Sequence, residues 1–390
     1  MKPIYFDNNA TTPVAPEVLE EMLPYFSEFY GNPSSMHTFG GQLHRKIEEA
    51  RAKVAGLIGA EPEEIIFTSC GTESDNTALM SAVESYPQKR HVITTRVEHP
   101  AVLNFCKHLS RKGYRITFIP VDNSGRLDMD AFLKAIDDDT AVVSVMYANN
   151  ETGVIFPITA IGGMLRERNI LFHTDAVQVA GKIPINVKDL PVDMFSISGH
   201  KLHAPKGIGA LYVRKGTRFY PYIIGGHQER GRRAGTENTA SIIALGKSCE
   251  SAKEHLDKEA DYLKRLRDRL EGALLKSCPD AQVNGDTENR LPNTTNISFN
   301  YVEGEAILLR LDEYGICASS GSACSSGSLE PSHVLRAMGI PYTAIHGSIR
   351  FSLSRYNTEG EVDKVIEMMP PIIKELRTLS PYGKEESRKC

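Results

Sequence analysis

Apolar residues in the first two thirds of the chain alternate between helical spacing and short continuous runs. The segment RKIEEARAKVAGLIGA (45–60) has apolar residues at helical spacing, and EIIFTS (64–69) is a short run typical of a strand. Strands rich in Val, Ile and Phe that alternate with helices predict a largely parallel sheet covered on both faces. The further predicted strands are HVITT (91–95), RITFIPV (115–121), AVVSVMYA (141–148), ILFHTDA (170–176), DMFSIS (193–198) and GALYVR (209–214).

The pattern changes after a long amphipathic stretch at about 240–275, which is too long for an ordinary helix and is predicted to connect two domains. Beyond it, TTNISFNYV (294–302), GICASSG (315–321) and SIRFSLS (348–354) are predicted strands, with a last helix near 359–379. These elements predict a smaller α+β domain. We therefore expect a large domain at 16–255, a small domain formed by 1–15 and 256–380, and a disordered charged tail at 381–390.

Length and charge narrow the class of protein. The chain has 390 residues, of which 41% are hydrophobic, enough for two domains. A formal net charge of −4 gives no basic field for nucleic acid or an anionic membrane. No apolar run approaches the ~20 residues that span a bilayer, and the N-terminus shows no signal-peptide pattern. We expect a cytoplasmic protein with no nucleic-acid or membrane partner.

Cysteine usage singles out one thiol. The chain has seven cysteines and no C-x-x-C pair, which argues against a disulfide framework and against a zinc or iron–sulfur cage built within the chain. Cys324 lies in SSGSACSSG (319–327), surrounded only by small residues. A buried structural cysteine would have apolar neighbours instead. A passive cysteine in a linker is the alternative to a functional thiol.

Polar residues follow five of the predicted strands. The sequences CGTESDN, RVEHP and NNETG come directly after strands, Asp175 and Gln178 end another, and GHK follows DMFSIS. Each could be an ordinary turn or helix cap. Ligands of open parallel sheets, however, collect beyond the carboxyl ends of the strands. Their joint occurrence predicts one crevice lined by all five.

The residue types in this crevice favour one cofactor. Gly71 and Thr72 begin a helix, where free N–H groups suit a phosphate. Lys201 follows a strand and could form a Schiff base, although a solvated surface lysine is the commoner situation. Asp175 would be costly to bury without a partner such as a protonated ring nitrogen. A phosphate cradle, an imine-forming lysine and such an aspartate together describe a site for pyridoxal phosphate.

The motifs CGTESDN, VEHPAV, NNETG, HTDAVQ, SGHKLHAPKGIG, RRAGTEN and SSGSACSSGSLEPSHVLRAMG make the chain resemble the cysteine desulfurases of the NifS/IscS group. The resemblance runs from YFDNNATTP to RFSLSRYNT. It implies the type I fold of pyridoxal-phosphate aminotransferases, with a mostly parallel seven-stranded sheet, and a homodimer. It also implies conversion of L-cysteine to L-alanine, with the sulfur held as an enzyme persulfide.

The resemblance further implies roles for individual residues. Lys201 would bind the cofactor as an imine, Asp175 would keep its ring nitrogen protonated, and His99 would stack on the ring and move protons. Cys324 would take the sulfur and carry it on a mobile loop. Arg350 would bind the substrate carboxylate with its guanidinium, although the strand pattern also allows an outward-facing arginine. The segment DNNATT would border the substrate.

Other positions would bind the cofactor itself. Gln178 and Asn150 would bond its phenolic oxygen, Gly71, Thr72, Ser198 and His200 its phosphate, and Thr236 the phosphate of the other subunit. A NifU- or IscU-type scaffold would accept the sulfur, and Cys324 could then transiently share an iron–sulfur cluster through its persulfide.

Two departures bear on the branch of the family. Ala204 stands where glycine is expected before PKG, which touches the loop next to Lys201, and the tail is short. Together with CSSGSLEPSHVLRAMGIPY this favours the NifS branch, which serves nitrogenase maturation. The remaining alternatives are an aminotransferase or a selenocysteine lyase on the same fold, and a sulfur carrier or scaffold without catalysis.

Overall fold

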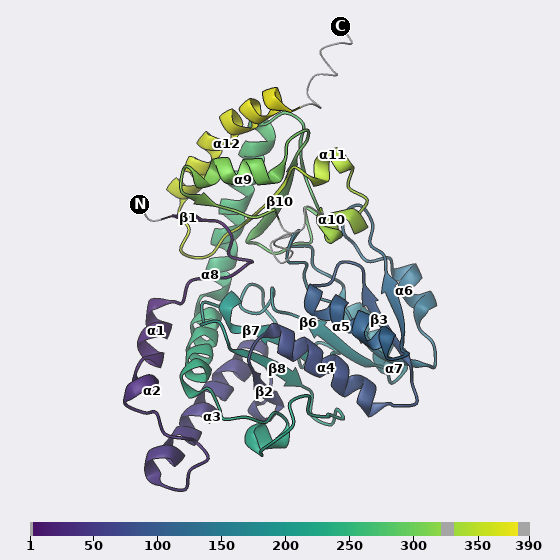
Figure 1. Ribbon diagram of the computed structural model, residues 1–390, viewed down its shortest axis with the longest axis vertical. Coiled ribbons are helices and arrows are strands. Elements are labelled where there is room, and N and C mark those ends of the chain that lie inside the picture. The colour runs from purple at the N-terminus through teal and green to yellow at the C-terminus, as the bar shows by residue number, and fades with distance from the viewer. Residues whose placement is uncertain (1–2, 321–330, 381–390) are drawn as a thin grey trace.

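The computed structural model describes residues 3–320 and 331–380 (Figure 1). The predicted nucleophile Cys324 and the predicted tail at 381–390 lie outside the described residues.

A seven-stranded sheet forms the centre of the larger part of the molecule, as predicted. Its strand order is β2-β8-β7-β6-β5-β3-β4, and only β8 runs antiparallel to its neighbours. Each strand is fully buried except the edge strand β4. The strands are β2 (Ile65–Thr68), β3 (His91–Thr95), β4 (Arg115–Ile119), β5 (Thr140–Ser144), β6 (Leu171–Asp175), β7 (Met194–Ser198) and β8 (Gly209–Val213).

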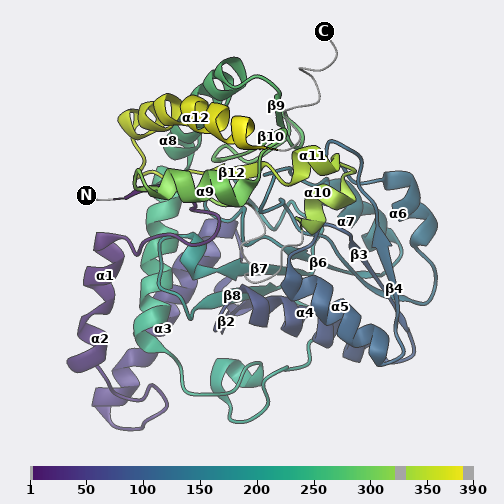
Figure 2. The same ribbon diagram turned by 45° about the horizontal axis from the view of Figure 1, so that its top comes forward.

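Helices cover both faces of this sheet because successive side chains of each strand point to opposite sides. In β5, Val142 packs with α4 and α5, whereas Val143 packs with α3, α7 and α8. Figures 1 and 2 show α4 and α5 together on one face. The helices of this part are α1 (Pro16–Met22), α2 (Pro24–Ser27), α3 (Thr38–Ile58), α4 (Gly71–Ser85), α5 (Pro100–Arg111), α6 (Met129–Ala135) and α7 (Ile158–Glu167).

One helix, α8 (Thr239–Ser277), joins the two parts. Its 39 residues extend over ~58 Å. Apolar residues from Ile242 to Ala252 contribute to the core of the large sheet, whereas the leucines from Leu263 to Leu274 belong to a second core. The prediction of a long connecting helix is confirmed, and the two cores support the proposed two-domain division.

The second core lies under a three-stranded antiparallel sheet of order β12-β10-β9. The apolar residues of β12 alternate with Ser348, Arg350 and Ser352, which face the other way. The elements here are β9 (Ala281–Val283), β10 (Thr294–Phe299), α9 (Gly304–Asp312), β11 (Ile316–Cys317), α10 (His333–Ala337), α11 (Tyr342–Ile345), β12 (Ser348–Ser352) and α12 (Glu359–Leu379).

The N-terminal segment ties the two parts together. Its strand β1 (Ile4–Tyr5) pairs with β11. The next residues then bond to both parts: the amide of Asn8 donates to the carbonyl of Ser352 at 3.1 Å, and the amide of Thr12 donates to that of His200 at 2.9 Å. This segment therefore passes between the large sheet and the small one.

Several element boundaries differ from the sequence prediction. Helix α3 begins at Thr38 rather than residue 45, because the His37 side chain caps it by accepting from the Gly40 amide. Of the described residues 315–320 in the predicted strand at 315–321, only Ile316 and Cys317 form β11. β1 and β9 were not predicted, since strands of two and three residues carry too little periodicity to be recognised.

Candidate active site

The polar strand ends predicted to meet do border one cavity, of about 340 Å³. Five of the strands that contribute to it (β2, β3, β5, β6 and β7) run in one direction, so their carboxyl ends lie at the same edge of the sheet. The predicted site residues that line the cavity are Gly71, Thr72, His99, Asn150, Asp175, Gln178, Ser198, His200, Lys201 and Arg350.

Lys201 ends a short 3₁₀ turn, Gly199–Lys201, that directly follows β7. Its Nζ donates to the main-chain carbonyls of Asn9 and Ala10, both at 2.6 Å. The amine is therefore positioned inside the cavity by the N-terminal segment, and is not the solvated surface lysine of the alternative interpretation.

Helix α4 turns its N-terminus toward the cavity. Its first residue is Gly71, and the preceding Cys70 makes no side-chain capping bond. A Cβ at Gly71 would lie 2.8 Å from Cγ2 of Val177, so a larger residue here would force a neighbour to shift. Uncapped N–H groups and a glycine that allows close approach suit a phosphate.

Two buried acidic side chains, Asp75 and Asp175, line the same cavity. Asp175, the last residue of β6, accepts the Val177 amide at 2.9 Å, and burial raises its pKa to about 6. Burial, and then the nearby Asp175, raise the pKa of Asp75 well above its usual range. A protonated ring nitrogen would relieve this excess of buried acid. The N-terminus of α4 at Gly71, the two buried acids and Lys201 therefore fit pyridoxal 5′-phosphate.

His99 caps helix α5 with its ring. Nδ1 accepts from the Ala101 amide at 3.2 Å, so the proton of the neutral ring is on Nε2. Burial, with the positive charge of Lys201 next in size, lowers the pKa of His99 to about 4. His99 is therefore neutral at pH 7, with Nδ1 engaged in the helix cap.

Arg350 enters the cavity from the small sheet. The alternative of an outward-facing arginine is wrong, because the residue is only 2% exposed. Its Nη2 pairs with Oδ1 of Asp7 at 2.6 Å and its Nη1 donates to the carbonyl of Asn150 at 3.0 Å. Within the described residues its buried Nε has no hydrogen-bond partner. One edge of the guanidinium is thus available to an anion.

One predicted residue of the described part of the chain, Thr236, does not line this cavity. Thr236 is exposed and lines a separate depression of about 180 Å³ with residues of the β2 and β8 ends. Cys324 belongs to residues 321–330, outside the described part of the chain. No cluster of three metal-ligating side chains occurs in the described ranges 3–320 and 331–380.

The structure adds one residue that sequence reasoning missed, Asp75, which lines the cavity. It also gives contacts to residues of DNNATT: the carbonyls of Asn9 and Ala10 accept from Lys201, and the carboxylate of Asp7 pairs with Arg350. DNNATT was expected near the substrate, but sequence alone offered no reason to pair Asp7 with Arg350 across 343 positions.

Comparison with known proteins identifies the family. The profile of the class-V aminotransferases matches residues 4–365. The chain belongs to the class-V aminotransferase family. Within it, the chain is 61% identical to a cysteine desulfurase of Trichormus azollae over 99% of its length and 97% of that protein's. It is 57% identical to the cysteine desulfurase NifS of Azotobacter vinelandii, covering 98% and 95%.

A solved NifS-like protein has the same fold, with a TM-score of 0.89, 42% identity and coverage of 96% of this chain and 100% of that one. This chain is therefore a cysteine desulfurase of the NifS type, and its cofactor is pyridoxal 5′-phosphate.

Among the described residues, no helix has the length and apolar composition that a membrane span requires.

Proposed function

We propose that the cavity at Lys201 removes sulfur from L-cysteine, yielding L-alanine and a persulfide on Cys324. The observation that carries this proposal is the convergence of five strand ends, Lys201 and Arg350 on one cavity. The reaction balances without an added oxidant: the Cβ–S bond of the substrate breaks, an S–S bond forms, and Cβ is reduced as the sulfur is oxidised.

Each residue has a defined task in this proposal. Arg350 binds the substrate carboxylate through Nε and one Nη. Lys201 binds the cofactor and then, once its amine is released, takes the α-proton, while His99 exchanges protons through Nε2. When bound, pyridoxal 5′-phosphate supplies an electron sink for the negative charge left on the substrate, and Asp175 holds the proton of its ring nitrogen.

The other cofactor contacts follow from the lining of the cavity. Gln178 and Asn150 bind the phenolic oxygen, and Ser198 and His200 bind the phosphate together with Gly71 and Thr72. The Nδ1 of His200 lies 3.1 Å from Oγ1 of Thr11, which leaves its Nε2 for the ligand. Burial lowers the pKa of His200 to about 4, so it acts as a neutral donor.

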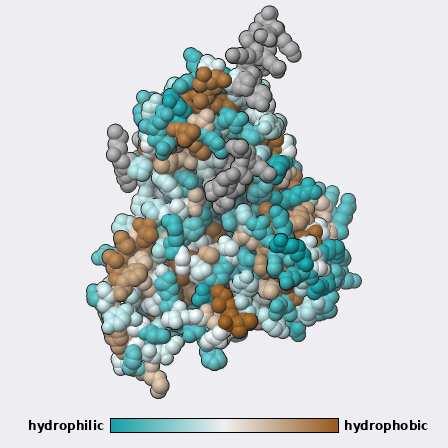
Figure 3. Space-filling model, viewed as in Figure 1, coloured by the Kyte–Doolittle hydropathy of each residue, from teal (hydrophilic) through white to brown (hydrophobic). Residues whose placement is uncertain are grey.

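We also propose a homodimer in which Thr236 binds the phosphate held by the partner subunit. Thr236 is exposed in a single chain. Large apolar side chains of α1, α2 and the segment after them are exposed too, with Phe26 61% and Tyr30 69% accessible, and Figure 3 shows apolar surface over α1 and α2. A second copy of the chain would cover them. Mixed dimers of Lys201→Ala and Thr236→Ala chains should then regain one intact site and part of the activity.

The sulfur acceptor and the compartment are further proposals. A NifU- or IscU-type scaffold, with a role in nitrogenase maturation, is the acceptor proposed on the resemblance to NifS, and Cys324 would transiently share its cluster. The cysteines of the described residues are all free thiols, which is typical of the reducing cytoplasm.

The deciding experiment measures alanine and sulfide from L-cysteine in the presence of a thiol reductant. The Cys324→Ala variant should keep the yellow cofactor and bind cysteine, yet release no sulfide. Lys201→Ala should hold the cofactor only noncovalently, with no adduct fixed by borohydride. Sustained turnover by Cys324→Ala would reject the nucleophile, and a keto-acid product would favour an aminotransferase.

A further inference from the structure

A second lysine, Lys182, lies directly behind the active site. Its Nζ donates to Oε1 of Gln178 at 2.9 Å and to Oδ1 of Asn9 at 3.2 Å. Both acceptors belong to residues that line the cavity, whereas Lys182 does not line it. It instead borders a smaller cavity of about 30 Å³ on the far side of Lys201.

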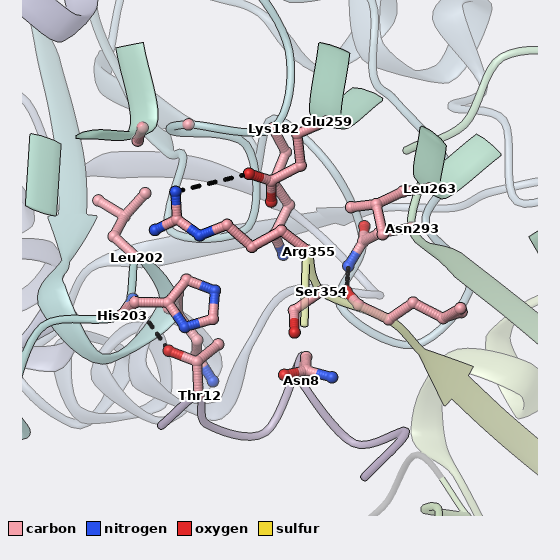
Figure 4. Close-up of a pocket in the computed structure, with 14 residues that line it drawn as sticks. Asn8, Thr12, Lys182, Leu202, His203, Glu259, Leu263, Asn293, Ser354 and Arg355 are labelled. Atoms are coloured by element: carbon pink, nitrogen blue, oxygen red, sulfur yellow. Dashed lines mark hydrogen bonds and ion pairs between the residues drawn. The ribbon is translucent and has the colours of Figure 1, made fainter. Parts of the chain in front are cut away.

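Figure 4 looks into this smaller cavity, where the guanidinium of Arg355 faces the carboxylate of Glu259 and Lys182 lies beside Glu259. The carboxylate of Glu259 favours the charged amine of Lys182. Burial and the charges of Lys201 and Arg350 oppose it more strongly and lower the pKa of Lys182 to about 7. Both the ammonium and the neutral amine carry the two N–H groups that the contacts to Gln178 and Asn9 use.

The contact with Gln178 has a consequence for the active site. A side-chain amide can be turned by 180°, which exchanges its oxygen and its NH₂ group. A lysine that only donates in this contact holds Oε1 toward itself. Nε2 then points the other way and donates to the carbonyl of Asn9 at 3.0 Å, the same carbonyl that accepts from Lys201 Nζ. The second hydrogen of Nε2 remains for the cavity.

We propose that Lys182 is a positioning residue that fixes the amide orientation of Gln178, so that the glutamine presents N–H and not oxygen to the cofactor. The inference deepens the proposed function, on which it rests. The phenolic oxygen of the cofactor carries negative charge, so a turned amide would place an oxygen against an oxygen. Lys182 opposes this turn without touching the cofactor, and it acts together with the carbonyl of Asn9, which accepts from Nε2 and would face an oxygen in the turned amide.

The test compares Lys182→Met with Gln178→Ala in the cofactor-loaded enzyme. Lys182→Met should shift the visible absorption band of the bound cofactor in the same direction as Gln178→Ala and lower kcat about tenfold, as expected for one lost hydrogen bond. In the Gln178→Ala background, Lys182→Met should change neither quantity further, because Lys182 acts only through Gln178. Lys182→Arg, which also only donates, should restore the wild-type band.

Lys188→Met is the matched control, since that lysine pairs with Glu61 on the surface; its band and kcat should equal the wild type's. If Lys182→Met does not fold, Lys182→Arg and Lys182→Gln are compared, and only the glutamine should shift the band. An unchanged band in Lys182→Met, additive effects in the double variant, or equal bands for arginine and glutamine would overturn the inference alone. A wild-type protein that binds no pyridoxal 5′-phosphate would overturn the proposed function as well.

Discussion

The two sheets deliver their functional residues in different ways. In the large sheet these residues stand at strand ends, with Asp175 the last residue of β6 and Ser198 the last of β7. In the small sheet Arg350 occupies the middle of β12, opposite Asn296 of β10. Both sheets nevertheless contribute to one cavity.

The difference follows from what covers each sheet. Helices cover both faces of the large sheet, so a side chain in mid-strand is buried beneath them and only the edge is open. The small sheet has one apolar face, with Ile349 and Phe351 in the second core. Its other face carries Arg350 toward the large sheet. A parallel sheet covered by helices on both faces places its functional residues at the ends of strands. A sheet with only one apolar face can also place them in the middle of a strand, on the other face.

The largest expected effect comes from the edge of the large sheet. Asp175→Asn should bind cofactor but lower kcat by about a thousandfold, because a neutral amide does not hold the proton on the ring nitrogen. The matched control is Asp193→Asn, just before β7 at the opposite edge, where the carboxylate accepts the Phe172 amide. Steady-state kinetics should show near wild-type kcat for the control. Equal losses in both variants would remove the distinction between the two edges.

Adjacent residues of β12 test the two-faced nature of the small sheet. Arg350→Lys should lower kcat/KM for L-cysteine about a hundredfold, since lysine lacks the bidentate fork. Ile349→Ala should instead lower the free energy of unfolding by about 2–5 kcal/mol through a core cavity, with KM unchanged. Kinetics and denaturant unfolding of both variants decide the point. A KM change in Ile349→Ala would show that the faces are not independent.

Gly71→Ala tests the close packing between α4 and Val177 at the edge of the large sheet. The new Cβ would meet Val177 at 2.8 Å. We expect cofactor affinity to fall about tenfold, from a steric cost of ~1–3 kcal/mol, and Val177→Ala to restore it in the double variant. Titration of the apoenzyme with pyridoxal 5′-phosphate measures this. Gly163→Ala, in α7 with open space around it, is the control and should bind normally.

The smallest effect concerns a buried histidine in mid-sheet. His173 lies between Ser144 and Ser196, and burial lowers its pKa to about 3. Below about pH 6.5 the unfolded chain takes up a proton that the folded protein refuses until about pH 3. The contribution of neutral His173 to the stability of the fold is therefore present above pH 6.5 and is lost as the pH falls from 6.5 toward 3.

His173→Gln should reduce the slope of the free energy of unfolding against pH between pH 3 and 6.5, by at most ~1.4 kcal/mol per pH unit. Denaturant titrations at pH 7, 6 and 5 measure the slope. An unchanged slope would mean that His173 is protonated in the fold.

The sequence by itself predicted the parallel sheet, the long connecting helix and the residues that meet at the strand ends. These features depend on local periodicity and on the rule that parallel strands end at a common edge, so a linear pattern records them. The motifs also predicted Lys201, Asp175 and the glycine of α4, because each chemical task allows few residue types.

Only the tertiary structure decided how the N-terminal segment and the small sheet complete the site. The pairing of Asp7 with Arg350 and the two carbonyls that hold Lys201 join residues that are far apart in the sequence. Hydrogen bonds to main-chain carbonyls leave no mark on residue identity, and the face that a mid-strand arginine presents depends on what packs against the sheet. Such contacts follow from packing, which no short stretch of sequence encodes.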